Sequence, residues 1–396
     1  MDRHPASRIG WGGAIGALTA MALGCLITGE VVDSKPVPAR SARAGHLAQH
    51  AADDVSAAIR RLRPSVEGID GFLVQWASST SLPISDHCHC LLGLGGDFLR
   101  ADGVRECEWI SRHSSGGGGD GRVGWIVKGV GGWFVVRRRG IGLWENGEAH
   151  VGQVVCDLAI AGVGDSDLTL RSPDGSAITL RALSISCLDA IQADPEVDVE
   201  FVVRGLLEWA PRDAWISGSG RRFSLDDLAI RLLERPPGKG PCFGTHVIGG
   251  LAAIQHSSLV GELPSSTRSS VESRLRSFVS QTLTSVGDDG WIAPPTSLPD
   301  WIAMDFKTRF AYQAHCTECL VDALPAETIR SDPHLALAVL RLATEMTSRP
   351  AEVSPTDLCH ARRALRKFYL AADAFSRDSP SRASSEAVQA TGIRRR

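Results

Sequence analysis

The chain has 396 residues, 43% of them hydrophobic, so it holds enough apolar material for a large core. Its formal net charge is −3 at pH 7 and no stretch expected to fold is strongly basic, which argues against nucleic acid as a partner. The ten cysteines show no spacing typical of a disulfide scaffold, so their pairing stays open.

The N-terminal region has the composition of an export segment. A polar flank at residues 1–9 precedes residues 10–29, which contain no charged side chain and are just long enough to span a bilayer. A transmembrane anchor and a cleaved signal peptide both fit this stretch, and Ala22-Leu23-Gly24-Cys25 is similar to a lipoprotein cleavage site. Residues 30–43 form a Pro/Ser-rich linker. We expect contact with a membrane through this segment and a body outside the cytoplasm.

Residues 44–372 are expected to form one mainly helical domain. A helix begins at Ala44 and stops at Pro64, and a short second helix contains Phe72 and Trp76. Apolar residues at steps of three and four predict further helices over residues 87–94, 147–161, 182–192, 197–208, 225–233, 245–254, 269–283, 309–323, 332–347 and 358–372.

The remaining segments are turns, one hairpin and a tail. Pro173-Asp174-Gly175 between two apolar stretches predicts a β-hairpin near residues 168–181, and residues 133–136 look extended. The Gly-rich residues 114–121 lack the Lys-Ser/Thr of a phosphate loop and are expected to be a flexible loop. Residues 373–396, rich in Ser, Ala and Arg, are expected to be a disordered tail.

The rest of the chain is organised around the Gly/Pro loop at residues 238–246. This loop leads into a helix for which Thr245 is the expected N-cap, and it places Cys242, Thr245 and His246 at one helix mouth. Gly249 and Gly250 follow inside the helix, where each glycine costs roughly 1 kcal/mol relative to alanine. That cost favours a helix that other helices approach closely.

Four of the expected helices share one design. Each has a histidine in or near its first turn, followed by small and aliphatic residues: His87, His150, His246 and His315. Other helices alternate with them, which predicts stacked helical hairpins. If the hairpins close on themselves, the small-residue helices form an inner ring, and the histidines meet at one end of it.

Two stretches carry a resemblance to known proteins. Gln281 followed by Asp289-Gly290-Trp291 resembles a turn of α/α-toroid proteins, the terpene-cyclase and protein-prenyltransferase class. Residues 222–228 and 238–246, with the His-x-x-Glu step at His315 and Glu318, resemble an uncharacterised family of anchored bacterial proteins over about residues 140–370. The resemblance implies an all-α dominated α/α-toroid of helical hairpins with a small β-hairpin insertion. It implies no activity.

The chain departs from the toroid enzymes at their reactive motifs. The Asp-x-Asp-Asp of the protonating cyclases is absent, and Asp226-Asp227 lacks the third Asp of the diphosphate-binding type. Asp86-x-Cys88 has the spacing of the prenyltransferase zinc step, but in a different helix position, so we treat it as coincidence. No metal site is assigned, and the cofactor stays open.

The candidate chemistry is centred on one expected helix. His315, Glu318 and Cys319 share a helix face, where His with Cys at i+4 can bind zinc and His with Glu at i+3 suits proton transfer. His315, Glu318 and His246 are the candidate catalytic residues. Four further residues are candidates for ligand binding: His150, Thr245, Cys242 and His87. His87 and His89 flank Cys88 and point to different helix faces, so at most one of them faces the cavity. The competing interpretation makes these side chains structural contacts between helices.

Two classes of function remain open. One is an exported module that binds a partner or a ligand, with a small molecule or a glycan as the expected ligand. The other is an enzyme of the terpene-cyclase-like or polysaccharide-acting toroid type that uses His/Glu acid–base chemistry. Serine-hydrolase and zinc-protease motifs are absent from the sequence, so a familiar hydrolase is not supported.

Overall fold

The architecture was obtained as a computed structural model. It describes residues 42–79, 82–115, 125–129, 132–135, 147–193, 198–236, 241–294 and 304–378. The chain divides into a short N-terminal unit, Met1–Ala44, and a second unit, Gly45–Arg396, which contains nearly all of the described residues.

The described residues are mostly helical, which confirms the expected fold class at the level of an all-α chain with small hairpins. The α-helices are α1 (Ala42–Ala77), α2 (Ile84–Leu94), α3 (Glu106–His113), α4 (Gln153–Ile160), α5 (Leu180–Ala193), α6 (Val199–Trp209), α7 (Leu225–Glu234), α8 (Thr245–His256), α9 (Ser265–Thr284), α10 (Phe306–Ala323), α11 (Ala326–Ser331), α12 (Pro333–Ser348) and α13 (Pro355–Asp378). Short 3₁₀ turns cover Pro241–Gly244, Val260–Glu262 and Pro350–Glu352.

The described strands form antiparallel hairpins. The pairs are β1 (Ile126–Gly129) with β2 (Gly132–Val135), β3 (Leu170–Arg171) with β4 (Ala177–Ile178), and β5 (Ala214–Ile216) with β6 (Arg222–Ser224). The second pair confirms the hairpin predicted near residues 168–181. Its register places Leu170 opposite Ile178, both buried.

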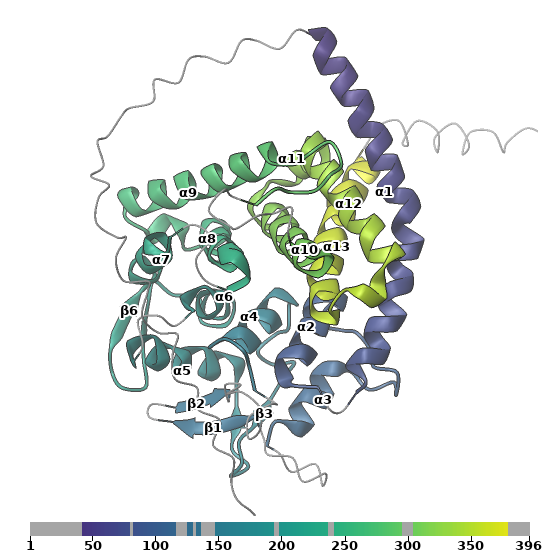
Figure 1. Ribbon diagram of the computed structural model, residues 1–396. Coiled ribbons are helices and arrows are strands. Elements are labelled where there is room, and N and C mark those ends of the chain that lie inside the picture. The colour runs from purple at the N-terminus through teal and green to yellow at the C-terminus, as the bar shows by residue number, and fades with distance from the viewer. Residues whose placement is uncertain are drawn as a thin grey trace, which may run out of the picture. The chain divides into compact units, whose positions relative to one another are not determined.

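A set of helices follows a closed sequence of contacts. α2 packs on α4, α4 on α6, α6 on α8, α8 on α10, α10 on α13, and α13 returns to α2 (Figure 1). Other helices pack on the members of this set: α5 on α6, α7 and α9 on α8, and α12 on both α10 and α13. α2 and α13, which are far apart in the sequence, are therefore neighbours in the fold.

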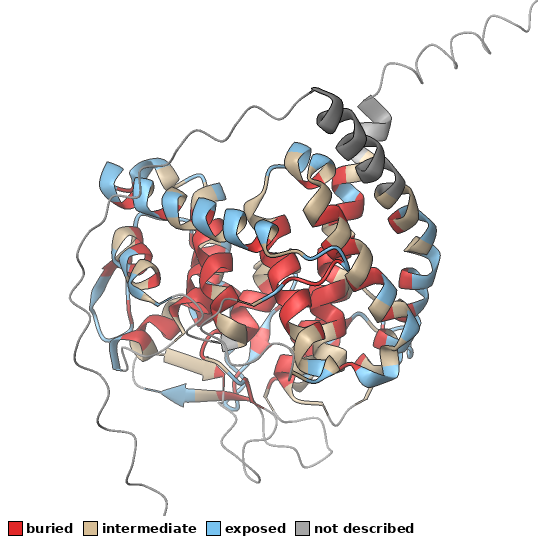
Figure 2. Cartoon of the chain, turned by 45° about the horizontal axis from the view of Figure 1, so that its top comes forward, coloured by how far each residue is buried: buried red, intermediate tan, exposed pale blue. Residues whose placement is uncertain are grey.

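The helices of the closed contact sequence differ in burial from the helices that pack on them. Figure 2 shows buried residues concentrated on helices in the middle of this unit, while α9 is exposed along much of its length. Every residue of α10 from Tyr312 to Val321 is buried, although the segment contains His315, Thr317 and Glu318. The sequence has therefore placed polar side chains in the core, where they need partners.

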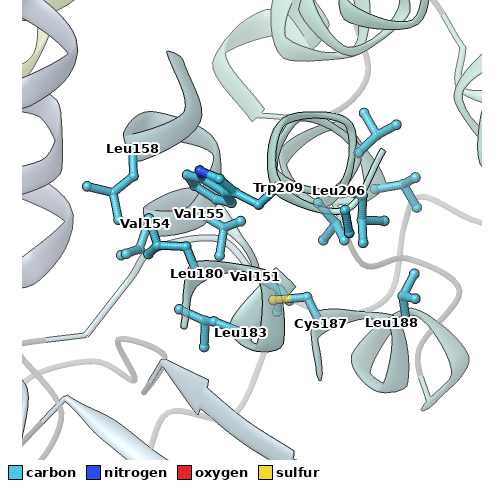
Figure 3. Packing of buried hydrophobic residues seen from close by; sticks show 14 of the residues in the cluster. Val151, Val154, Val155, Leu158, Leu180, Leu183, Cys187, Leu188, Leu206 and Trp209 are labelled. Carbon is cyan, nitrogen blue, oxygen red and sulfur yellow. The ribbon is translucent and has the colours of Figure 1, made fainter. Parts of the chain in front are cut away.

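Close packing of α4, α5 and α6 is shown in Figure 3. Val155 and Leu183 lie in a cluster of buried aliphatic side chains that Trp209 covers, and the Trp209 indole donates to the Val163 carbonyl at 2.9 Å. Gly205 permits this approach, because a Cβ there would lie 2.0 Å from the Val155 side chain.

The expected stop at Pro64 is wrong, because α1 continues through it to Ala77. Proline removes one helical hydrogen bond, but the buried face of α1 continues on both sides of it, from Ile59 to Leu73. Ion pairs between α1 and α13 add to this packing, with Arg362 to Asp70 at 2.6 Å. Tertiary contacts override the local break.

Three expected boundaries also shift. α4 begins at Gln153, so His150 precedes it; Gly152 takes a left-handed φ of 80°, and its N–H donates to the Glu148 carboxylate at 2.9 Å. α8 has Gly244 as its N-cap in place of Thr245. α13 continues past residue 372 to Asp378.

The expected flank 1–9, the segment 10–29 and nearly all of the linker lie outside the described residues, as do residues 116–121 of the Gly-rich loop and the tail beyond residue 378. Among the helices that the structure describes, none combines the length and the apolar character needed to cross a membrane.

Candidate functional site

Three helices of the closed contact sequence bring histidines together. His246 is the second residue of α8, His315 lies in the middle of α10, and His360 lies near the start of α13. The His315 and His360 ring centroids are 3.9 Å apart, and the His246 ring is 5.1 Å from His315 and 5.8 Å from His360. We call these three residues the histidine centre.

Glu318 fixes the orientation of His360. His360 Nδ1 lies 2.6 Å from Glu318 Oε2, and Arg363 donates to the other carboxylate oxygen. Burial by itself would raise the pKa of Glu318, but His360 and Arg363 outweigh it and hold the pKa well below the usual value. Glu318 in turn raises the pKa of His360 against the effect of burial. The two side chains form a buried, charge-assisted pair.

A second carboxylate extends this network away from the histidines. Asp322 accepts from Arg363 at 2.9 Å and from Arg204 at 2.8 Å, and it also pairs with Lys367. These cations outweigh the effect of burial and lower the pKa of Asp322. The charges under the centre are therefore matched, which is the condition for burying them.

The surroundings of His246 and His315 disfavour the charged imidazolium. Burial lowers the pKa of both rings well below the usual histidine value, and the neighbouring charge of His360 adds to the effect. His315 is 3% exposed, and its Nδ1 has no hydrogen-bond partner among the described residues. Its Nε2 lies 3.8 Å from Asp357, beyond hydrogen-bond distance. The centre thus contains imidazole lone pairs without protein donors.

The loop before α8 brings a thiol to the same place. Cys242 and Phe243 have φ values of 49° and 63°, which makes them the described non-glycine residues in the left-handed region. Thr245 stabilises this turn, since its hydroxyl donates to the Cys242 carbonyl at 2.7 Å. Cys319 Sγ donates to the Thr245 carbonyl at 3.1 Å and ties the loop to α10. Burial raises the pKa of the Cys242 thiol to about 12.

Donor atoms of two overlapping groups lie close enough to share one ion. Cys242, His246 and His315 each offer a donor atom, and these atoms lie within 4.8 Å of one another. His315, Glu318 and His360 form a second such group under the same limit. His315 belongs to both groups.

α2 and α4 cover the far side of the centre. The His89 ring lies 5.0 Å from His360, and His89 Nδ1 donates to the Ser85 carbonyl at 2.7 Å. Asp157 on α4 lies 3.5 Å from His89 Nδ1 and is buried, and burial raises the pKa of its carboxyl. The centre is therefore surrounded by polar groups on more than one side.

A cavity of about 410 Å³ lies between α8, α9 and α10. Its lining includes Phe243, Ile248, Phe278, Tyr312 and Cys316 and does not include the three histidines. It is thus a neighbouring space, reached from other faces of α8 and α10.

The predicted site residues divide into two groups. Cys242, His246, His315 and Glu318 come together as expected, with Thr245 fixing the Cys242 turn. His150 is half-buried, binds Asp198 at 2.8 Å and stacks on Phe201, which separates it from His246. His87 lies outside the centre: it binds Glu106 and stacks on Trp109.

The sequence did not point to His360 or Arg363, and of the two histidines on α2 the prediction named His87, whereas the structure places His89 beside His360. His360 follows the Ser354 cap of α13 by six positions and is flanked by Cys359 and Ala361, the same pattern of a histidine among small residues near a helix start. That pattern was available as a signal for His360. The choice between His87 and His89 depended on which helix face packs inward.

The expectation that the histidines mark the mouth of the ring also changes. α10 begins at Phe306, well before His315, so His315 and Glu318 lie in mid-helix and are almost fully enclosed. The cysteines that the structure describes are all free, and only Cys242 among them is not fully buried. No family model, curated protein sequence or solved structure matches this chain.

Proposed function

We propose that the chain is an exported, membrane-anchored ligand-binding protein with an α/α-toroid body, and that the histidine centre is its binding site. The closed sequence of contacts from α2 through α13 supports the toroid, because an inner ring with an outer layer of helices requires such contacts. The uncharged residues 10–29 support the anchor and a body outside the cytoplasm.

The observation that carries the binding function is the convergence of His246, His315 and His360 from three helices on one point. A core built only for packing would favour apolar side chains there, because an unpartnered buried polar group costs about 1–3 kcal/mol. His315 Nδ1 is such a group. A bound ligand would supply the missing interaction.

An enzyme remains the second candidate, and the neutral state of two histidines favours it. Burial lowers the pKa of His246 and His315, which favours the neutral rings that have a lone pair for a proton, although it also makes each ring a weaker base. Glu318 is a poor general acid, since His360 and Arg363 hold it ionised. Acid–base chemistry at this centre would therefore be carried out by histidines.

Native mass spectrometry of the full chain, purified from membranes, tests the binding function. We expect a bound mass in the wild-type protein that is lost in His315→Ala and retained in His334→Ala, whose side chain is 45% exposed. A structural role predicts the opposite: no bound mass, and a large fall in the melting temperatures of both His315→Ala and His246→Ala.

Fractionation and protease treatment of intact cells test the location. We expect the full-length chain in the membrane fraction and cleavage of the body from outside. A soluble cytoplasmic pool of full-length chain would contradict the anchor and leave the binding site unaffected.

A further inference from the structure

The position of Glu318 separates the donors of the centre into two kinds. Both carboxylate oxygens of Glu318 are in use, one with His360 Nδ1 at 2.6 Å and the other with Arg363. This leaves the His360 Nε2 atom, on the opposite side of the ring, for another partner. A carboxylate that binds one nitrogen of a histidine and orients the other is the usual arrangement behind a metal-binding histidine.

The other donors face the same space. His315 is 3% exposed and has an unpartnered Nδ1, and its ring lies 3.9 Å from the His360 ring. Donor atoms of Cys242, His246 and His315 lie within 4.8 Å of one another. Ligand atoms around a tetrahedral zinc are about 3–4 Å apart, so small side-chain movements would bring these three donors to one ion. A movement of the His360 ring toward His246, whose ring centroid is 5.8 Å away, would add the fourth.

The backbone of the loop is a further independent observation. Cys242 and Phe243 both occupy the left-handed region, which is strained for non-glycine residues. This turn holds Cys242 four residues before His246, at the start of α8. The turn places the Cys242 thiol close to His246 and His315, where it can bind the same ion.

We propose that the ligand of the histidine centre is a zinc ion bound by Cys242, His246, His315 and His360. The donor set of one thiolate and three imidazoles is one that zinc accepts in tetrahedral geometry, whereas magnesium and calcium prefer oxygen. Cys242 binds as the thiolate and His360 binds through Nε2 as the neutral imidazole, so each gives one proton to solvent when the ion binds. Four protein ligands fill the tetrahedral coordination of zinc. The bound ion therefore has no open coordination position for a substrate.

This inference rests on the proposed function, since it names the ligand of that site. Its first test is the metal content of the full chain purified without chelators, measured by mass spectrometry of the elements. We expect zinc in equimolar amount. Replacing zinc with cobalt should give the visible spectrum of a tetrahedral site together with a thiolate-to-cobalt charge-transfer band.

Variants separate the ligands from their neighbours. His315→Ala and His360→Gln should lose most of the zinc, while His150→Ala, which removes a histidine bound to Asp198 outside the centre, should keep it. Cys242→Ser should abolish the charge-transfer band. Cys316→Ser is its matched control, because Cys316 faces the neighbouring cavity and the band should remain.

Glu318→Gln tests the positioning role. It should weaken zinc binding about 10–100-fold while the cobalt spectrum keeps its tetrahedral form. Loss of zinc in the helix variants could also result from unfolding. Cys242→Ser is expected to fold, because Cys242 lies on a partly exposed loop outside the inner helices, so its effect on the metal can be separated from unfolding.

Two outcomes would overturn the zinc assignment. One is a folded wild-type protein without zinc whose melting temperature does not respond to added zinc. The other is a cobalt spectrum that Cys242→Ser and His360→Gln leave unchanged. If the protein instead carries an organic mass that His315→Ala removes, the proposed binding function stands and only the zinc assignment fails.

Discussion

The described residues contain two buried groups of histidine, glutamate and arginine with the same internal geometry. In the first, between α2 and α3, His87 Nδ1 lies 2.5 Å from Glu106 and Arg100 donates to the other oxygen of Glu106 at 2.9 Å. All three side chains are at most 3% exposed. The Trp109 ring covers His87 at 4.1 Å, and Arg100 stacks on the same indole.

The second group, between α10 and α13, is His360 with Glu318 and Arg363. Here the free side of the histidine ring meets His315 and His246 instead of tryptophan. In both groups the carboxylate fixes one imidazole nitrogen. The Nε2 atom of His87 has no hydrogen-bond partner among the described residues. The two groups therefore differ in the rings that lie beside the histidine, a tryptophan in the first and two further histidines in the second.

The largest effect on stability is expected from a substitution that breaks the first group. Glu106→Gln leaves the buried Arg100 without its hydrogen-bonded carboxylate, although it keeps the Ala77 and Ser78 carbonyls and the partly exposed Asp102 at 3.6 Å. Breaking a buried pair in this way lowers the free energy of unfolding by about 3–5 kcal/mol. Denaturant unfolding measures it. The control is Glu108→Gln, which removes an exposed pair with Arg112 and should cost less than about 1 kcal/mol.

A third buried carboxylate, Glu200, has no hydrogen bond to a histidine or an arginine among the described residues, so it sharpens the comparison. Glu200 is 1% exposed, neither of its oxygens has a hydrogen-bond partner among the described residues, and burial raises its pKa to about 7. The folded chain therefore binds a proton that the unfolded chain releases above pH about 4.5. Stability should fall by up to about 3 kcal/mol as pH rises from 4.5 to 7, at about 1.4 kcal/mol for each pH unit.

Glu200→Gln isolates this contribution. The variant should show a flatter dependence of stability on pH and should exceed the wild type at pH 8, because it carries no charge to bury. Unfolding curves of both proteins across this range measure the difference. Parallel curves would show that Glu200 is ionised at no cost in the folded chain.

The contact between the helices that carry the two groups can be broken at Gly93. A Cβ at Gly93 on α2 would lie 2.9 Å from the Cys359 Cα on α13, so backbone must move. Gly93→Ala should destabilise the chain by about 1–3 kcal/mol in a denaturant titration. Gly71→Ala on α1 has no atom within 4 Å of the new Cβ and should be neutral or slightly stabilising.

The smallest effect is expected when the histidine of the first group is replaced and ligand binding is measured. His87→Gln should leave the bound ligand of the wild type unchanged, since His87 contacts Glu106 and Trp109 rather than the centre. The same substitution at His360 should remove the ligand. Equal losses in both variants would mean that the two groups act as one unit.

The parts of the fold that local chemistry determines could be read from the sequence. Ser224 and Asp227 form the capping box that begins α7, and Ser354 accepts from the Asp357 N–H at the start of α13. The β3–β4 hairpin follows from its turn residues. Pro64 shows the limit, since long-range packing of α1 outweighs a local signal.

The site was predictable where its members share a helix. Glu318 follows His315 by one turn of α10, and His246 belongs to a recognisable loop. His360 approaches them only through the packing of α13 on α10, a contact that no spacing in the sequence specifies. For the same reason spacing alone could not choose between His87 and His89.

The closure of the contact sequence by α13 also sets an order in time. During synthesis the other described helices leave the ribosome before α13. Until α13 follows, Glu318 and Asp322 lack Arg363, and α2 lacks its contact with α13. Contacts between residues so distant in sequence form late in folding. A chain terminated before α13 would lack His360 and would leave α2 and α10 without the helix that joins them.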